Sequence, residues 1–359
     1  MTATARGAEA ERATVAYHLA LTRVGAATIE DALRLWTLVP PTRVAATSAR
    51  WLQQAITLVL TRRGQARDLA MAYYRLVRAL RTGRTIADPR RPEPPYVTID
   101  LLRREFAALA GPVATAPDTA QPTTTPADPP ELHERASASE SHGDEGDTDA
   151  EVDRILVEQI VDLGSAMARQ EQADADELAN ALAELGPVNL ERKLRDIDPE
   201  APATQVDQAR DDAHRRAGAR QAAAAERIAL NGARGTLWSA AERDRRAVGY
   251  VRLSRSGTPC GWCAMLISRG VAYKSARSAT YADGDKYHDN CHCYAEPVFS
   301  DDQFEGSALT ALNRRYAADW PRVTKGLSGK TAISAWRRFI RTEQAAAQEA
   351  RRTRSVQEA

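Results

Sequence analysis

The sequence predicts a mainly α-helical chain with a small α+β module, stabilised by zinc, near its C-terminus. Apolar residues recur at helical spacing on both sides of a central segment that is rich in Pro and acidic residues. All four cysteines lie between Cys260 and Cys293. The helical spacing predicts the helices, the central segment predicts a disordered linker, and the cysteine window predicts the metal-stabilised module.

These observations divide the chain into five predicted segments. They are a helical N-terminal domain at 10–110, a disordered linker at 111–150, a helical region at 151–247, a zinc-binding module at 248–345 and a polar tail at 346–359.

The formal net charge is only +1, so the total charge gives no argument for a nucleic-acid partner. Its distribution is uneven. Residues 1–110 carry 17 Arg and 9 acids, a net of 17 − 9 = +8, whereas residues 131–151 carry 8 acids and 1 Arg, a net of 1 − 8 = −7. No apolar run approaches the roughly 18 residues that a membrane span needs, and we therefore expect a soluble chain.

The N-terminal domain is predicted to contain two long helices. The first carries Tyr17, Leu21 and Trp36 at helical spacing and ends at Pro40-Pro41. The second runs from Trp51 to Leu80, with Thr47 or Ser48 as its expected cap. Seven arginines follow this second helix, at positions 62, 63, 67, 75, 78, 81 and 84. They form either a solvated face or a surface for DNA phosphates or an acidic protein partner.

The region after the linker is predicted to be helical from about 152 to Leu185, where Gly186-Pro187 ends the helix. A second helix covers 203–232, Gly232 and Gly235 mark its end, and a short helix follows from Leu237 to Arg246. Two strands, 250–254 and 294–299, flank the cysteine window. Two final helices are predicted from Leu309, Leu312 and Tyr316 and from Ile333, Trp336 and Ile340, the last fraying after Gln344.

The cysteine window has the spacing of a metal site. Cys260-x-x-Cys263 is followed by His288-x-x-Cys291-x-Cys293, so five good ligands compete for the four places of a tetrahedral zinc. The spacing does not decide which of the five is left out. His292 is a sixth candidate, but its neighbours on both sides are cysteines that point the other way.

Other uses of the four cysteines fit the sequence less well. Two disulfides would suit a secreted chain, but the first ten residues lack the apolar core of a signal peptide. A redox Cys-x-x-Cys needs no second cluster, and no βαβ pattern surrounds this one. A catalytic zinc keeps an open position beside a general base. Glu296 and Asp289 are near in sequence, but nothing in the sequence gives them that role, so a closed structural zinc is the favoured interpretation.

The amino-acid sequence around the cysteine window resembles that of one known family. The segment from Val248 through Pro259-Cys-Gly-Trp-Cys263 to Tyr287-His-Asp-Asn-Cys-His-Cys293 resembles the MuF-like head morphogenesis proteins, which are minor capsid proteins of tailed phages, in particular the actinobacteriophage type. Leu35-Trp36, Trp51 and the segment 69–75 resemble the helical region of those proteins more loosely.

The resemblance implies a minor capsid protein that is made in the host cytoplasm and enters the procapsid near the portal in few copies. It implies a virion location, in the capsid interior or portal region, and contacts with the portal protein and with scaffold or major capsid protein. Packaged DNA is a further possible partner through the Arg-rich helices. The residues that it carries over, as metal ligands only, are Cys260, Cys263, His288, Cys291 and Cys293.

Two other functions stay open at this stage. A capsid maturation protease would need an activated Ser, and outside the metal cluster and the linker only His18 and His214 are left as a base. Neither is accompanied by a G-x-S-x-G turn. The second alternative is a zinc-dependent DNA-binding or nuclease module. The sequence identifies no catalytic residue for either.

Overall fold

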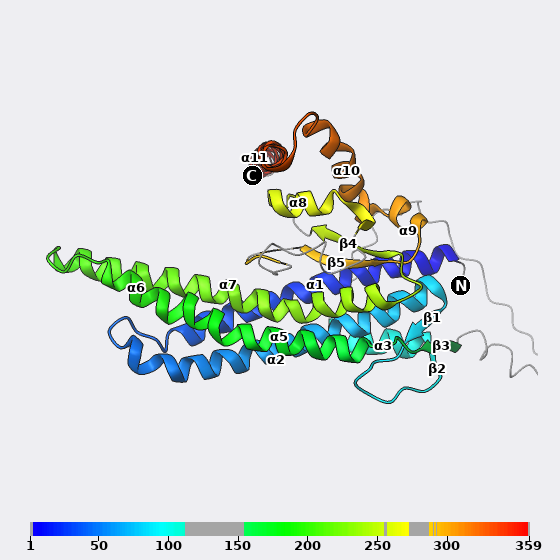
Figure 1. Ribbon diagram of the computed structural model, residues 1–359, viewed down its shortest axis with the longest axis horizontal. Coiled ribbons are helices and arrows are strands. Elements are labelled where there is room, and N and C mark those ends of the chain that lie inside the picture. The colour runs from blue at the N-terminus through cyan, green and yellow to red at the C-terminus, as the bar shows by residue number, and fades with distance from the viewer. Residues whose placement is uncertain are drawn as a thin grey trace, which may run out of the picture.

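The computed structural model describes residues 3–111, 154–254, 257–272, 287–289, 291 and 293–357. Nearly all of the linker predicted at 111–150 lies outside these ranges, as does His292. The long helices α1 (Ala3–Trp36), α2 (Val44–Thr82), α5 (Leu163–Ala183) and α7 (Ala203–Arg243) run along the long axis of the molecule, and the small sheet and the helices of the C-terminal part lie on one side of them (Figure 1). The prediction of a mainly α fold with a small α+β part near the C-terminus is therefore confirmed.

The long helices alternate in direction along the bundle (Figure 1). Between α2 and α5 in the sequence lie three short strands, β1 (Arg84–Ile86), β2 (Tyr96–Thr98) and β3 (Arg154–Glu158). They form a sheet in the order β1-β3-β2, with β3 parallel to β1 and antiparallel to β2. The elements of this part are α1 (Ala3–Trp36), α2 (Val44–Thr82), β1 (Arg84–Ile86), β2 (Tyr96–Thr98), α3 (Ile99–Ala110), β3 (Arg154–Glu158), α5 (Leu163–Ala183), a π-helix (Glu184–Val188), α6 (Asn189–Arg195) and α7 (Ala203–Arg243).

The C-terminal part is built on two antiparallel strands, β4 (Gly249–Ser254) and β5 (Cys293–Val298), whose register pairs Ser254 with Cys293. Both strands were predicted from the sequence. The other elements are α8 (Gly261–Ile267), a 3₁₀ turn (Gly270–Ala272), α9 (Asp301–Gly306), a second 3₁₀ turn (Ala308–Thr310), α10 (Ala311–Val323) and α11 (Gly329–Gln357).

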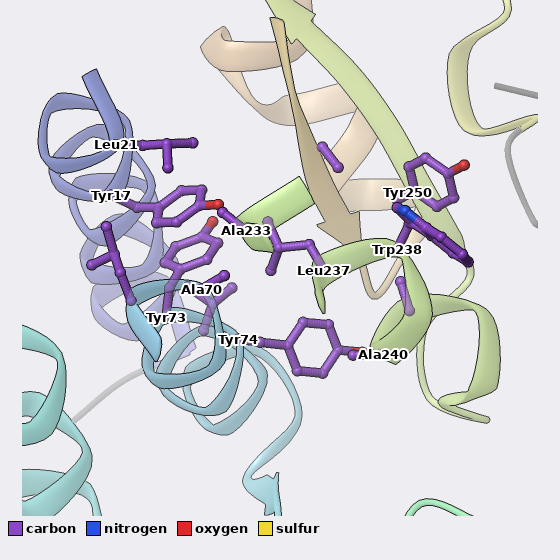
Figure 2. Packing of buried hydrophobic residues seen from close by; sticks show 14 of the residues in the cluster. Tyr17, Leu21, Ala70, Tyr73, Tyr74, Ala233, Leu237, Trp238, Ala240 and Tyr250 are labelled. Carbon is purple, nitrogen blue, oxygen red and sulfur yellow. The ribbon is translucent and has the colours of Figure 1, made fainter. Parts of the chain in front are cut away.

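The hydrophobic interior forms two main clusters. The larger one joins α1, α2 and α7 to the C-terminal part, and Figure 2 shows Tyr17, Tyr73 and Leu237 packed within it. The rings of Tyr17 and Tyr73 stack with centroids 4.3 Å apart. The other cluster, which we call the distal core, contains Trp36 and Trp51 together with Val59, Leu178, Leu182, Leu190 and Ile228.

The arginines of α2 do not form a single solvated face. Arg63, Arg75 and Arg78 are at most 2% exposed, and each meets carboxylates from another element. Arg63 pairs with Glu171 and Asp174, Arg75 with Glu93 and Glu105, and Arg78 with Asp244 and Glu158. The sequence shows the helical spacing of the arginines but not their distant acidic partners. These three arginines therefore form neither a solvated face nor a surface for DNA or an acidic protein, and both interpretations were wrong for them.

Three predicted element boundaries were wrong. Helix α2 begins at Val44, and the hydroxyls of Thr47 and Ser48 donate to carbonyls of the first turn instead of capping it. The segment around Ile155 is a strand, because β1 and β2 offer backbone partners on both of its edges. Gly186-Pro187 does not end the helical region, since a π-helical turn leads directly into α6.

Helix α7 continues through the glycines that were predicted to end it. A Cβ added to Gly232 would lie 2.5 Å from the backbone oxygen of Arg63, so glycine is needed there for close approach of α7 to α2. The predicted short helix from Leu237 is the end of α7. Helix α11 likewise continues to Gln357 where fraying was predicted after Gln344.

Candidate metal centre

The first pair of candidate ligands lies at the start of α8. Cys260 caps this helix, and its sulfur accepts a hydrogen bond from the backbone N–H of Cys263 at 3.4 Å. The N–H of Ala264 bonds to the carbonyl of Cys260 at 2.8 Å. The turn directs both sulfurs to the same side, as a chelating pair requires.

The second pair lies on the turn that leads into β5. The N–H of Cys291 donates to the carbonyl of His288 at 3.1 Å and closes this turn. The Nδ1 of His288 lies 2.7 Å from the carbonyl oxygen of Asp289, which can only accept a hydrogen bond. In the neutral imidazole the Nδ1 therefore carries the proton, and the Nε2 offers its lone pair to a metal.

The structure brings all five predicted ligands together in two overlapping groups. Cys260, Cys263 and His288 form one group, and Cys263, Cys291 and Cys293 form the other. The Nε2 of His288 lies 3.2 Å from the sulfur of Cys260 and 3.4 Å from the sulfur of Cys263. The sulfurs of Cys263 and Cys291 are 3.5 Å apart.

These three separations are equal to those of a tetrahedral metal site or a few tenths of an ångström shorter. Bonds of about 2.0–2.3 Å to N and S place neighbouring ligand atoms about 3.5–3.8 Å apart. All four cysteines are free thiols, and the 3.5 Å between the sulfurs of Cys263 and Cys291 is far longer than a disulfide bond of about 2.05 Å. The cluster could therefore hold a metal ion.

Crowding of the thiols perturbs their proton affinities. Contacts with Cys263 and His288 lower the pKa of Cys260 to about 4, and contacts with Cys263 and Cys293 lower the pKa of Cys291 well below the usual value. The same contacts raise the pKa of Cys263, while the Cys260 and Cys291 sulfurs raise the pKa of His288 to about 10. A divalent cation among the sulfurs would let its ligand thiols ionise together.

Two buried arginines lie beside the cluster and were not expected from the sequence. Arg234 of α7 and Arg252 of β4 lie on the ring of Tyr287, with guanidinium carbons 4.1 and 4.0 Å from its centroid. Arg252 also approaches the sulfur of Cys263 at 4.0 Å. Their positive charge favours thiolate over thiol in this interior. Both lie outside the cysteine window, and no local spacing marks them.

The turn that carries His288 and Cys291 is attached to α7. The guanidinium of Arg234 donates to the carbonyls of Cys291 and Cys293, at 2.6 and 3.2 Å. Arg227 donates to the carboxylate of Asp289 at 2.8 Å. Because these contacts reach the ligand-bearing backbone itself, the position of the ligands depends on α7.

The two acids near the window also have partners in the bundle. Asp289 pairs with Arg227, whereas Glu296 accepts a hydrogen bond from the hydroxyl of Tyr73 at 2.7 Å and lies 3.1 Å from that of Thr14. Burial raises the pKa of Glu296 to about 7. Both carboxylates thus join the C-terminal part to α1, α2 or α7. Neither carboxylate is placed as a general base at the cluster.

The two histidines that a protease would need pack against aromatic rings. His18 lies against Tyr294, and His214 stacks on Trp36 with ring centroids 5.3 Å apart. Within the part of the chain that the structure describes, no helix is long and apolar enough to cross a membrane.

The comparisons with known proteins give one family. Residues 142–319 match the family described as VG15 protein. The family is viral and phage-associated, so the match supports a phage protein, and it covers just under half of the chain, including the whole cysteine cluster. No curated protein and no solved structure matched the chain. The match does not extend to α1, α2 or α11.

Proposed function

We propose that this chain is a minor capsid, or head morphogenesis, protein of a tailed phage, of the MuF-like kind, and that a structural zinc holds its C-terminal part together. The observation that carries the proposal is that the phage-family match spans the cluster of one histidine and four cysteines. A donor set of sulfur and imidazole nitrogen suits zinc.

The proposed ligands are Cys260, Cys263, His288 and Cys291. They form two pairs with the same two-residue spacing, each on a turn closed by a hydrogen bond. Cys293 begins β5 and is the remaining thiol. Four protein ligands fill a tetrahedral zinc and leave no position for a substrate, so the metal would support folding and not catalysis.

A matched pair of variants tests the ligand set. Cys291→Ser and Cys293→Ser remove the same atom from neighbouring buried positions. We expect the Cys293 variant to retain about one zinc per chain and the Cys291 variant to lose it. Metal analysis and the absorption spectrum of the cobalt-substituted protein measure this directly. Loss of metal only in the Cys293 variant would refute the proposed set.

The capsid role has its own test. The chain is co-expressed with the portal, scaffold and major capsid proteins of its phage, and purified procapsids are analysed by quantitative mass spectrometry. We expect a few copies per particle and, without the portal protein, a clear reduction. Absence from procapsids would contradict the role. Cleavage of scaffold or capsid protein that a single Ser substitution abolishes would support a maturation protease instead.

A further inference from the structure

The last helix has two different faces. On one face of α11, Ile333, Trp336 and Ile340 pack toward α8 and α10. The other face carries exposed basic residues. At about 100° per residue, they fall within a sector about 100° wide. We call this set the α11 basic face; it consists of Lys330, Arg337, Arg338, Arg341 and Arg352.

Charge on this face is poorly neutralised. Among the described residues, Lys330, Arg337, Arg338 and Arg341 have no ion-pair partner. The nearest acid in sequence, Glu343, pairs instead with Arg315 of α10 at 2.8 Å. Residues 329–357 contain seven basic residues and two acids, a net of 7 − 2 = +5, in a chain whose total is +1. The buried arginines of α2, in contrast, are all paired with carboxylates.

The face fits a phosphate backbone better than a membrane. Between its basic residues lie Ser334, Ala345 and Gln348, and no large apolar side chain is exposed in the described part of α11, whereas a membrane-surface helix needs such residues. The 22-residue distance from Lys330 to Arg352 corresponds to about 33 Å of helix, close to one turn of B-DNA. Arginine, which predominates here, forms bidentate contacts with phosphate.

We propose that the α11 basic face binds duplex DNA through its phosphates, without sequence preference. The sequence had placed a possible DNA surface on α2, but the structure buries three of those arginines and exposes the ones of α11. The surface lies outside the part of the chain that matches the phage family. The proposed DNA binding depends neither on the metal centre nor on the capsid role.

The test uses the full-length, metal-loaded protein and a fluorescein-labelled 30-base-pair duplex in anisotropy titrations at several salt concentrations. One variant carries Arg337→Gln, Arg338→Gln and Arg341→Gln. Its control carries Arg34→Gln, Arg210→Gln and Arg215→Gln, which change the charge equally at exposed arginines that are paired with acids of their own helices. Circular dichroism verifies that both variants are folded.

For four or five neutralised phosphates, the slope of log affinity against log salt should be about −4 in the unmodified protein. We expect the α11 variant to lose at least tenfold in affinity and most of this slope, with the control within about twofold. The proposal is overturned by absent DNA binding at 50 mM salt or by equal losses in the two variants. Stronger binding to polyglutamate than to DNA would instead assign the face to an acidic protein.

Discussion

The helical bundle and the C-terminal part bury their interiors in different ways. The distal core of the bundle closes around Trp36 and Trp51, and buried ion pairs such as Arg63 with Asp174 connect its helices. The C-terminal part has a sheet of two strands, β4 and β5, and a small hydrophobic cluster on it contains the buried residues Val251, Leu253, Tyr294 and Val298. A two-stranded sheet is marginally stable alone.

This difference indicates that a bound metal would stabilise the C-terminal part more than the bundle. The long helices of the bundle bury apolar residues along most of their length. Under the proposed function, the C-terminal part depends on the ligand cluster and on contacts with α7, α1 and α2. These contacts include Arg234 to the carbonyls of Cys291 and Cys293, and Tyr73 to Glu296. We therefore predict that loss of the metal unfolds the C-terminal part and leaves the bundle folded.

The largest expected effect comes from Cys263→Ser, because the sulfur of Cys263 contacts both His288 and Cys291. We expect zinc content to fall from about one per chain to near zero and the C-terminal part to unfold, since structural zinc contributes about 10 kcal/mol or more in small modules. Metal analysis with near- and far-ultraviolet circular dichroism measures both effects. Full metal content in this variant would refute the site, and Cys293→Ser is its matched control.

The bundle should respond to loss of a buried ion pair. Arg78→Met leaves the carboxylate of Asp244, whose side chain is 2% exposed, without its guanidinium partner. We expect a loss of about 3–5 kcal/mol in urea unfolding. The control, Arg34→Met, removes an arginine that is 67% exposed, and should cost about 0–1 kcal/mol. Similar losses in the two variants would show that the buried pair is not important for the bundle.

The junction between the regions should depend on pH through Glu296. Burial raises its pKa from 4.5 to about 7, so the folded state binds the proton more tightly than the unfolded state. The associated stability is fully present below about pH 4.5 and is lost as pH rises through about 7, a change of about 2–3 kcal/mol between pH 5 and 9.

Glu296→Gln should remove this part of the pH dependence. The difference between the unfolding free energies of the variant and the unmodified protein should therefore grow in the variant's favour from pH 5 to pH 9. Glu30→Gln, at an exposed position, is the control and should give a nearly constant difference. A constant difference for Glu296→Gln as well would contradict the assignment.

The smallest effect concerns the contact of α7 with α2. Gly232→Ala would bring a Cβ to 2.5 Å from the backbone oxygen of Arg63, and we expect a loss of about 1–3 kcal/mol as the helices separate. Gly64→Ala, whose Cβ would be 3.7 Å from the nearest atom, should instead stabilise α2 by about 0.5–1 kcal/mol. Thermal unfolding of the two variants distinguishes them by the sign of the change.

Local patterns in the sequence predicted most of the fold. The helical spacing of Tyr73, Val77 and Leu80 and the alternation of 250–254 correspond to α2 and β4. The sequence did not predict β3, because that strand exists only through its pairing with β1 and β2, which come from a different part of the chain. Gly232 was misinterpreted because its close contact is with α2 and not with its own neighbours in sequence.

The ligands of the candidate site could also be predicted from local patterns, whereas the residues around them could not. Short spacings identified all five candidate ligands, and the structure brings these five together. Arg234 and Arg252, which flank Tyr287, could not be identified from the sequence because only the packing of α7 and β4 places them there. The partners of the buried arginines of α2 were unpredictable for the same reason.

The central claim is that a metal holds the C-terminal part against a bundle that folds without it. Hydrogen exchange with mass spectrometry, on the metal-loaded protein and after chelation, tests this most directly. We predict that β4, β5 and α8 lose protection on chelation, while the segments of α1 and α2 around Trp36 and Trp51 keep theirs. Unchanged protection in β4, β5 and α8, or equal loss around Trp51, would contradict the claim.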